Sequence, residues 1–114
     1  MQRPIVNLSE LQFLREIAHG EKFAAKLAPV SPLIGAKKLG YNVTAVPPGK
    51  RAFPLHNHHV NEELFFILQG EGTLRIGTQE HPIKSGDFIC CPPGGTDVAH
   101  QIVNTGSAEL RYLA

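Results

Sequence analysis

The sequence predicts an all-β domain, a sandwich or a barrel, with one short helix near its N-terminus. Beyond position 20 the chain consists of short runs rich in β-branched and aromatic residues, which favour strands. The segments between these runs contain glycine, proline, asparagine and aspartate, which favour turns. With 114 residues, 42% hydrophobic and 18% charged, the chain suits one domain with its own hydrophobic core.

The segment 8–20 (LSELQFLREIAHG) predicts the helix. Ser9 and Gln12 have the spacing of a capping box, and Gly20 favours a C-terminal stop. Apolar residues between them recur at the spacing of one helical face, at Leu11, Leu14 and Ile17. His19 would then place a favourable charge near the helix C-terminus.

Eight short runs predict the strands. They cover residues 22–30, 41–47, 63–69, 72–77, 81–84, 87–92, 99–104 and 109–114. The last run ends the sequence inside a strand pattern, so we expect either a natural terminus or a shortened form of a longer chain. Within a single domain, we divide the chain into an N-terminal helix and arm, 1–38, and a barrel part, 39–114.

The charge balance excludes several classes of partner. A formal net charge of +1, without a long run of Lys or Arg, gives no electrostatic footprint for nucleic acid or an anionic membrane. No apolar segment approaches the roughly 18 residues that a membrane span needs, and the N-terminus lacks a signal-peptide core. We therefore expect a cytoplasmic protein that binds neither nucleic acid nor membrane.

Several residues are interpreted as structural. Cys90 and Cys91 are adjacent, so on a strand they point to opposite faces, and we interpret them as small buried hydrophobes. Arg51 and Arg75 are interpreted as solvated surface residues. The aromatic residues expected in the core first, and in pocket walls second, are Tyr41, Phe53, Phe65 and Phe88.

A group of potential metal ligands lies at the start of the run 63–69. His56 and His58 are two residues apart, so they share one face of an extended chain. Glu63 follows on the next strand, and two imidazoles and a carboxylate can converge across a hairpin. This donor set is common for first-row metals. His100, which follows a loop rich in proline and glycine, is the candidate for a fourth ligand.

These residues resemble the two sequence motifs of the cupin family. In the first, Gly49 precedes His56 and His58, Glu63 follows after four residues, and Gly70 after six more. The spacer between Gly49 and His56 is one residue longer than the family's pattern. In the second motif, five residues separate Gly86 from Pro92, which is followed by Gly94, His100 and Asn104. Five residues separate Gly94 from His100 instead of two, which lengthens the loop 94–99.

The resemblance covers about residues 40–114 and implies a small antiparallel jelly-roll barrel with a metal site inside. It implies that His56, His58, Glu63 and His100 hold a divalent ion, with iron, zinc, manganese and nickel all left open. Open coordination positions would admit water, substrate or dioxygen.

Neighbouring polar residues are alternatives with weaker support. His59 is expected to face solvent or to stand behind the ligands, and His81 is expected to be exposed. Glu62 would replace Glu63 if the strand slipped by one residue, but the apolar face of Phe65 and Ile67 opposes that slip. Asp97 and Gln101 lie on either side of His100, and Asp97 is the candidate for a catalytic acid or base or a substrate contact.

Three functional hypotheses stay open. The first is a metal-dependent enzyme acting on a small organic molecule, by oxygen chemistry with iron or by isomerisation or lyase chemistry with other metals. The apolar strands around the site favour an oxygenase-like role or a mainly apolar ligand. The second is a non-catalytic cupin that binds or senses a small ligand. The third is an assembly role: we expect a homodimer, with residues 22–30 available as a strand for another subunit.

Overall fold

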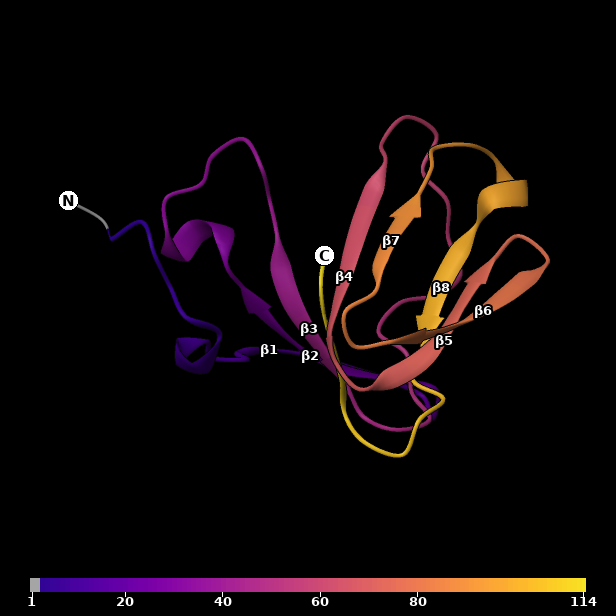
Figure 1. Cartoon of the computed structure of the whole chain (residues 1–114), viewed down its shortest axis with the longest axis horizontal. Coiled ribbons are helices and arrows are strands. Elements are labelled where there is room, and N and C mark those ends of the chain that lie inside the picture. The colour runs from indigo at the N-terminus through magenta and orange to yellow at the C-terminus, as the bar shows by residue number, and fades with distance from the viewer. Residues whose placement is uncertain (1–2) are drawn as a thin grey trace.

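The computed structural model describes residues 3–114 and consists of strands joined by short turns (Figure 1). The strands are β1 (Arg15–His19), β2 (Phe23–Pro29), β3 (Asn42–Val46), β4 (Glu63–Gln69), β5 (Glu71–Ile76), β6 (Gln79–Lys84), β7 (Phe88–Cys91), β8 (His100–Val103) and β9 (Leu110–Leu113). Three 3₁₀ turns complete the elements: η1 (Leu8–Glu10), η2 (Ser31–Leu33) and η3 (Thr96–Val98).

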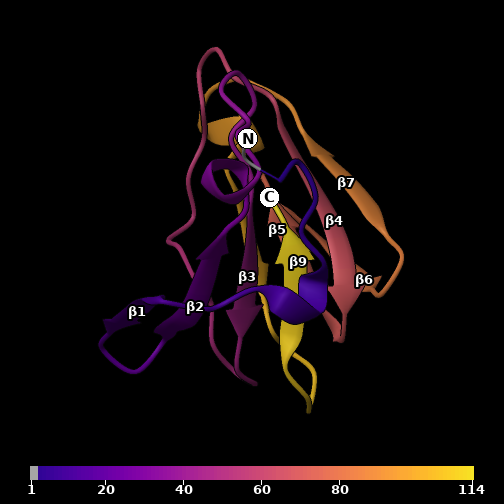
Figure 2. The same cartoon turned by 90° about the vertical axis from the view of Figure 1, so that its left-hand side faces the viewer.

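The strands form two antiparallel sheets, which confirms the all-β prediction. The larger sheet has the order β1-β2-β3-β9-β4-β7, and Figure 2 shows these strands fanned out side by side. The smaller sheet has the order β6-β5-β8. The expected barrel is not closed. Strand β9 lies between β3 and β4, and the segment 39–41 that leads into β3 turns away from the start of β4 (Figure 1).

The helix predicted over 8–20 is wrong. Only η1 is helical in this segment, and its cap is Asn7, whose Oδ1 accepts from the backbone N–H of Ser9 at 2.9 Å. Glu10 completes the capping box by accepting from the Asn7 backbone N–H at 3.0 Å. The second half of the segment is strand β1, paired with β2, and exposed His19 therefore ends a strand rather than a helix.

Tertiary pairing explains this difference. A helix of about ten residues is marginal by itself, so helical spacing is a weak signal when an adjacent strand offers backbone partners. All five residues of β1 pair with β2 in regular antiparallel register. Strand β2 pairs with β3 along its other edge, so the strand predicted to be available to another subunit has both edges occupied within this chain. The N-terminal segment is thus part of the larger sheet.

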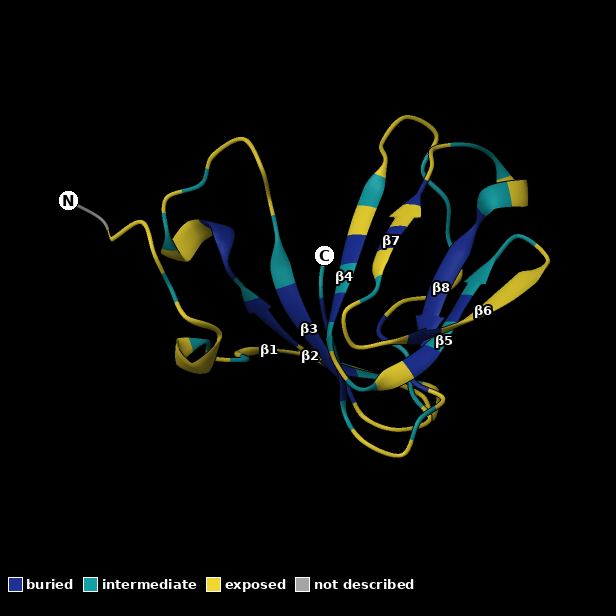
Figure 3. Cartoon of the chain, viewed as in Figure 1, coloured by how far each residue is buried: buried dark blue, intermediate teal, exposed yellow. Residues whose placement is uncertain are grey.

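The core lies between the two sheets, as the buried colour in Figure 3 shows. Strand alternation decides which residues enter it. On β7, Ile89 and Cys91 are buried, whereas Phe88 and Cys90 are exposed. The expectation of a core position is therefore confirmed for Cys91 and wrong for Phe88 and Cys90. Phe65 is buried as expected.

Gly70 lets the chain pass directly from β4 in one sheet to β5 in the other. Its φ of 89° is in the region that favours glycine. A Cβ at this position would lie 2.6 Å from the carbonyl oxygen of Glu109, because the turn crosses close to the chain that enters β9. Glycine at this position thus allows the turn to pack directly against the chain that enters β9.

No helix among residues 3–114 is long and apolar enough to cross a membrane.

Candidate metal centre

Strand β4 positions the carboxylate of the site. Glu63 is its first residue, and it shares a face with Phe65 and Ile67, both of which are buried in the core. These two apolar side chains fix the register, because a slip by one residue would expose them. Glu63 consequently points inward, and Glu62 is exposed on the other face, as the sequence predicts.

Backbone pairing brings His56 and His100 together. The backbone N–H of His56 donates to the carbonyl of His100 at 3.1 Å, and the reverse bond is 2.6 Å long. The loop after β7 holds the next histidine: the Gly94 N–H donates to the His58 carbonyl at 2.7 Å. Asn57 adds a side-chain bond to the Gly94 carbonyl at 3.1 Å. Backbone hydrogen bonds therefore connect the first motif, which contains His56 and His58, to the second motif, which contains Gly94 and His100.

Three imidazoles meet on one oxygen of Glu63. His56 Nε2 lies 3.3 Å and His100 Nε2 lies 3.1 Å from Glu63 Oε1, and His58 Nε2 also contacts this oxygen. One donor atom from each of the four residues lies within 4.8 Å of all the others. Three nitrogen donors and one carboxylate oxygen fit a first-row divalent ion, so the residues present can hold such a metal.

Two of the histidines are oriented by backbone carbonyls. His56 Nδ1 lies 2.9 Å from the Pro54 carbonyl oxygen, and His100 Nδ1 lies 3.4 Å from that of Val98. Because a carbonyl oxygen only accepts, the Pro54 contact requires a hydrogen on His56 Nδ1, and a metal bound at Nε2 would replace the hydrogen that this nitrogen otherwise offers to Glu63 at 3.3 Å. With Nδ1 bonded to a carbonyl, Nε2 is the nitrogen left to bind a metal, an arrangement typical of metal-ligating histidines.

The electrostatic setting keeps Glu63 ionised. Burial by itself would raise the pKa of this carboxyl group, but the hydrogen bond and charge of His100, the charge of His58 and the hydrogen bond of His56 outweigh it. The net result is a pKa below the ordinary value of 4.5. His100 is 1% exposed, whereas the other three residues are partly exposed. Solvent therefore reaches the centre through His56, His58 and Glu63 rather than through His100.

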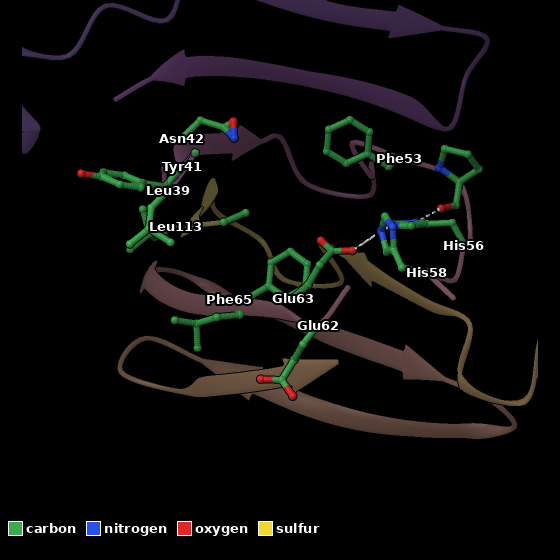
Figure 4. Close-up of a pocket in the computed structure, with 14 residues that line it drawn as sticks. Leu39, Tyr41, Asn42, Phe53, His56, His58, Glu62, Glu63, Phe65 and Leu113 are labelled. Atoms are coloured by element: carbon green, nitrogen blue, oxygen red, sulfur yellow. Dashed lines mark hydrogen bonds and ion pairs between the residues drawn. The ribbon is translucent and has the colours of Figure 1, made fainter. Parts of the chain in front are cut away.

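A cavity of about 740 Å³ opens onto these three residues. Figure 4 shows His56, His58 and Glu63 at one end, with Glu63 directed at the histidines and Glu62 directed away. Most of the remaining wall is apolar, from Leu39, Tyr41, Phe53, Phe65 and Leu113. The cavity lies between residues 39–42, which lead into β3, and residues 62–65 at the start of β4.

The other predicted residues lie outside the four-residue group. His59 and His81 are exposed, as expected. Asp97 is exposed in η3 and does not line the cavity, so its catalytic role stays a prediction. Gln101 is buried, 5% exposed, and its side chain is hydrogen-bonded to Arg75 and to the Phe53 carbonyl rather than to the four-residue group.

Sequence reasoning missed one part of the site. Leu39, Tyr41 and Asn42 line the cavity from the start of β3. Tyr41 was expected in the core first and in a pocket wall second, so its position agrees with the second expectation, whereas neither Leu39 nor Asn42 carried a local signal. The role of these two residues follows from how the segment before β3 is placed in the assembled fold.

Comparison with known families identifies the fold independently. A family model described as "Cupin domain" matches residues 42–114, which is more than half of the chain. The match contains all four clustered residues and the strands that carry them, from β3 to β9.

Individual relatives share this region. An oxalate-binding protein of Thermotoga maritima is 39% identical over 69 residues, covering 60% of this chain and 54% of the relative. The chain spans about half the length of the curated relatives it matches first.

Solved structures resemble a larger part of the chain. One is described as a predicted oxalate decarboxylase of Thermotoga maritima, with a TM-score of 0.78 and 29% identity over 96% of this chain and 94% of that one. Another is a candidate sugar phosphate isomerase of Acidithiobacillus ferrooxidans, with a TM-score of 0.72 and 31% identity. It covers 79% of this chain and 56% of the other.

Proposed function

The chain belongs to the cupin family, and from that premise we propose that it is a metal-dependent enzyme with oxygenase-like chemistry. Its substrate would be a small, mainly apolar organic molecule. In this proposal His56, His58, Glu63 and His100 hold one divalent ion, for which iron is our first choice. We also propose a cytoplasmic location.

One observation carries the proposal: three imidazole nitrogens and a carboxylate oxygen converge, and His56, His58 and Glu63 of this group line one end of an apolar cavity. A structural metal site is normally closed by protein ligands on all sides, whereas a catalytic site keeps a position open. Here the cavity gives small molecules access to the donor group from one direction. Bound iron(II) would supply the one-electron chemistry that reaction with dioxygen requires.

The chain's own residues bind and orient the substrate in this scheme. The aromatic rings of Phe53, Phe65 and Tyr41 provide flat apolar surfaces along the cavity. An apolar wall excludes water and strengthens electrostatic interactions near the centre. Asn42 is a polar side chain of the wall away from the donor group, and it would fix the substrate's orientation.

The charge of the cavity bears on the isomerase and lyase alternatives. No Lys or Arg lines it among the residues that the structure describes. A phosphorylated sugar or a dicarboxylate needs cationic or multiple hydrogen-bond donors to offset its charge beyond what a single metal provides. The cavity therefore favours a substrate with at most one anionic group, placed at the metal.

A non-catalytic role is the second candidate, favoured by the similarity to an oxalate-binding protein. In that case the same four residues and the same cavity would hold a ligand without turning it over. The two candidates differ in whether dioxygen is consumed when a bound ligand is present.

The test begins with elemental analysis of protein purified without added metal. The proposal expects about one divalent ion per chain, removable by a chelator, and oxygen uptake with at least one aromatic compound that raises the melting temperature. The variant His100→Ala should lose both the metal and the uptake. Ligand binding without oxygen uptake by the iron-loaded protein would favour the binding role. A protein that is purified without metal and does not bind added iron, manganese, nickel or zinc would refute both candidate functions.

We also propose that the protein is a homodimer. Leu64 and Phe88 are exposed apolar residues on the outer face of β4 and β7, and the rings of Phe66 and Phe88 lie 4.5 Å apart. Strand β7 is the last strand of its sheet. An exposed apolar face at a sheet edge is a feature that proteins normally cover.

A further inference from the structure

Gln101 is a buried amide whose partners lie outside the metal-binding group. Its Oε1 accepts from Arg75 Nη1 at 2.7 Å, and its Nε2 donates to the carbonyl of Phe53 at 3.0 Å. Arg75 is the cross-strand partner of Gln101 in the pairing of β5 with β8. Because a guanidinium only donates, Arg75 fixes which end of the amide faces it. The amide NH₂ group must then face Phe53.

The segment that receives this bond pairs irregularly with β8. Arg51 bridges Val103 and His56 bridges His100, both in antiparallel fashion. Residues 52–55 separate the two bridges on one strand, but only residues 101–102 separate them on the other. The pairing therefore bulges by two residues directly before His56. Bulges next to functional sites commonly redirect the side chain that follows them.

Side chains bind the two carbonyls at the centre of this bulge. Gln101 donates to the carbonyl of Phe53, and His56 Nδ1 lies 2.9 Å from that of Pro54. Pro54 has no N–H of its own to contribute to a ladder. The carbonyl that orients the His56 ring is thus the direct neighbour of the carbonyl that Gln101 holds.

We infer that Gln101, oriented by Arg75, is a positioning residue for the metal centre. It holds the bulge 52–55 so that the Pro54 carbonyl keeps His56 with its hydrogen on Nδ1 and its Nε2 toward Glu63. The inference rests on the proposed metal-dependent function. It differs from that proposal in assigning a role to residues that touch neither metal nor substrate.

The variant Gln101→Glu tests this role, with Co²⁺ as the probe. A glutamate still accepts from Arg75 but cannot donate to the Phe53 carbonyl when ionised. Its added negative charge alone would strengthen binding of a cation, whereas loss of positioning should weaken Co²⁺ binding about tenfold to a hundredfold. Gln79→Glu, at an exposed position of β6, makes the same charge change as a matched control and should leave the affinity unchanged.

A second readout does not depend on metal. Nitrogen-15 NMR of the metal-free protein should show a hydrogen on His56 Nδ1 in the parent chain and in Gln79→Glu, whether or not Nε2 also carries one toward Glu63. In Gln101→Glu, and in the neutral variant Gln101→Met, it should show Nδ1 without its hydrogen in part of the molecules. Unchanged Co²⁺ affinity together with unchanged protonation of His56 Nδ1 in the folded variants would overturn the inference. If the parent chain binds no Co²⁺, the metal proposal fails, and the protonation of Nδ1 still decides whether Gln101 positions His56.

Discussion

His58 and His59 are adjacent histidines with opposite surroundings. His58 contacts the Glu63 carboxylate and belongs to the four-residue group, whereas His59 is exposed and is not part of that group. The direction of a side chain along an extended segment, rather than its chemical type, separates these two residues.

We therefore predict different effects of the same substitution at these two positions. His58→Asn removes a direct donor, and the affinity for a divalent ion should fall by more than the roughly hundredfold that loss of a supporting contact can cost. His59→Asn should leave the affinity unchanged. Calorimetric titration of each metal-free variant with Co²⁺ or Zn²⁺ measures both. Equal losses in the two variants would show that the site is not the one described.

The spacing of donor residues predicted the centre because strand parity and motif order depend only on local sequence. His56 and His58 share a face, and Phe65 and Ile67 fix the register that turns Glu63 inward. The role of Gln101 lacked such a signal. It depends on Phe53, 48 positions away in sequence, and on a bulge that exists only after β8 has paired.

At the scale of elements, strand positions were predictable from alternating runs and turn residues, but the first element was not. Residues 8–20 contain capping and apolar residues at helical spacing, yet they form η1 and β1. The partner strand β2 decided the outcome, because backbone pairing along five residues outweighs a marginal helix propensity. A local sequence pattern does not show whether a partner strand is available to pair with the segment.

The turns between elements lead to a second prediction, for Gly70 and Gly86. Both have positive φ, 89° and 95°, but a Cβ at Gly70 would meet the Glu109 carbonyl at 2.6 Å, whereas one at Gly86 would meet no atom within 4 Å. Gly86→Ala should lower the free energy of unfolding by about 1–2 kcal/mol, from backbone strain alone. Gly70→Ala adds the clash and should cost about 3–5 kcal/mol.

Urea denaturation of the two variants measures this difference. Gly86→Ala is the control for backbone conformation, so the excess cost of Gly70→Ala reports the close approach of β9. Equal costs would mean that the Glu109 segment moves away freely, and that β9 is held in place by something other than this turn.

At the scale of the whole molecule, the resemblance implied a jelly-roll barrel, of which the all-β antiparallel fold is confirmed and the closure is not. The cavity beside the four donors lies between residues 39–42 and 62–65, a space that no local sequence pattern predicted. The proposed substrate class depends on this cavity. A closed barrel with the same four donors would leave less room for an organic substrate.

The outer face of the larger sheet leads to the last prediction, on assembly. Phe88 is 76% exposed beside Phe66, on the final strand of the sheet, and a second copy of the chain would remove this apolar surface from water. Light scattering coupled to size exclusion should show a dimer for the parent chain. Phe88→Lys should shift it to a monomer, because the buried charge would lack a partner. Val60→Lys, which adds the same charge at an 85% exposed position between strands, should remain a dimer. A monomeric parent chain, or a Phe88→Lys variant that stays dimeric, would show that this face is not the interface.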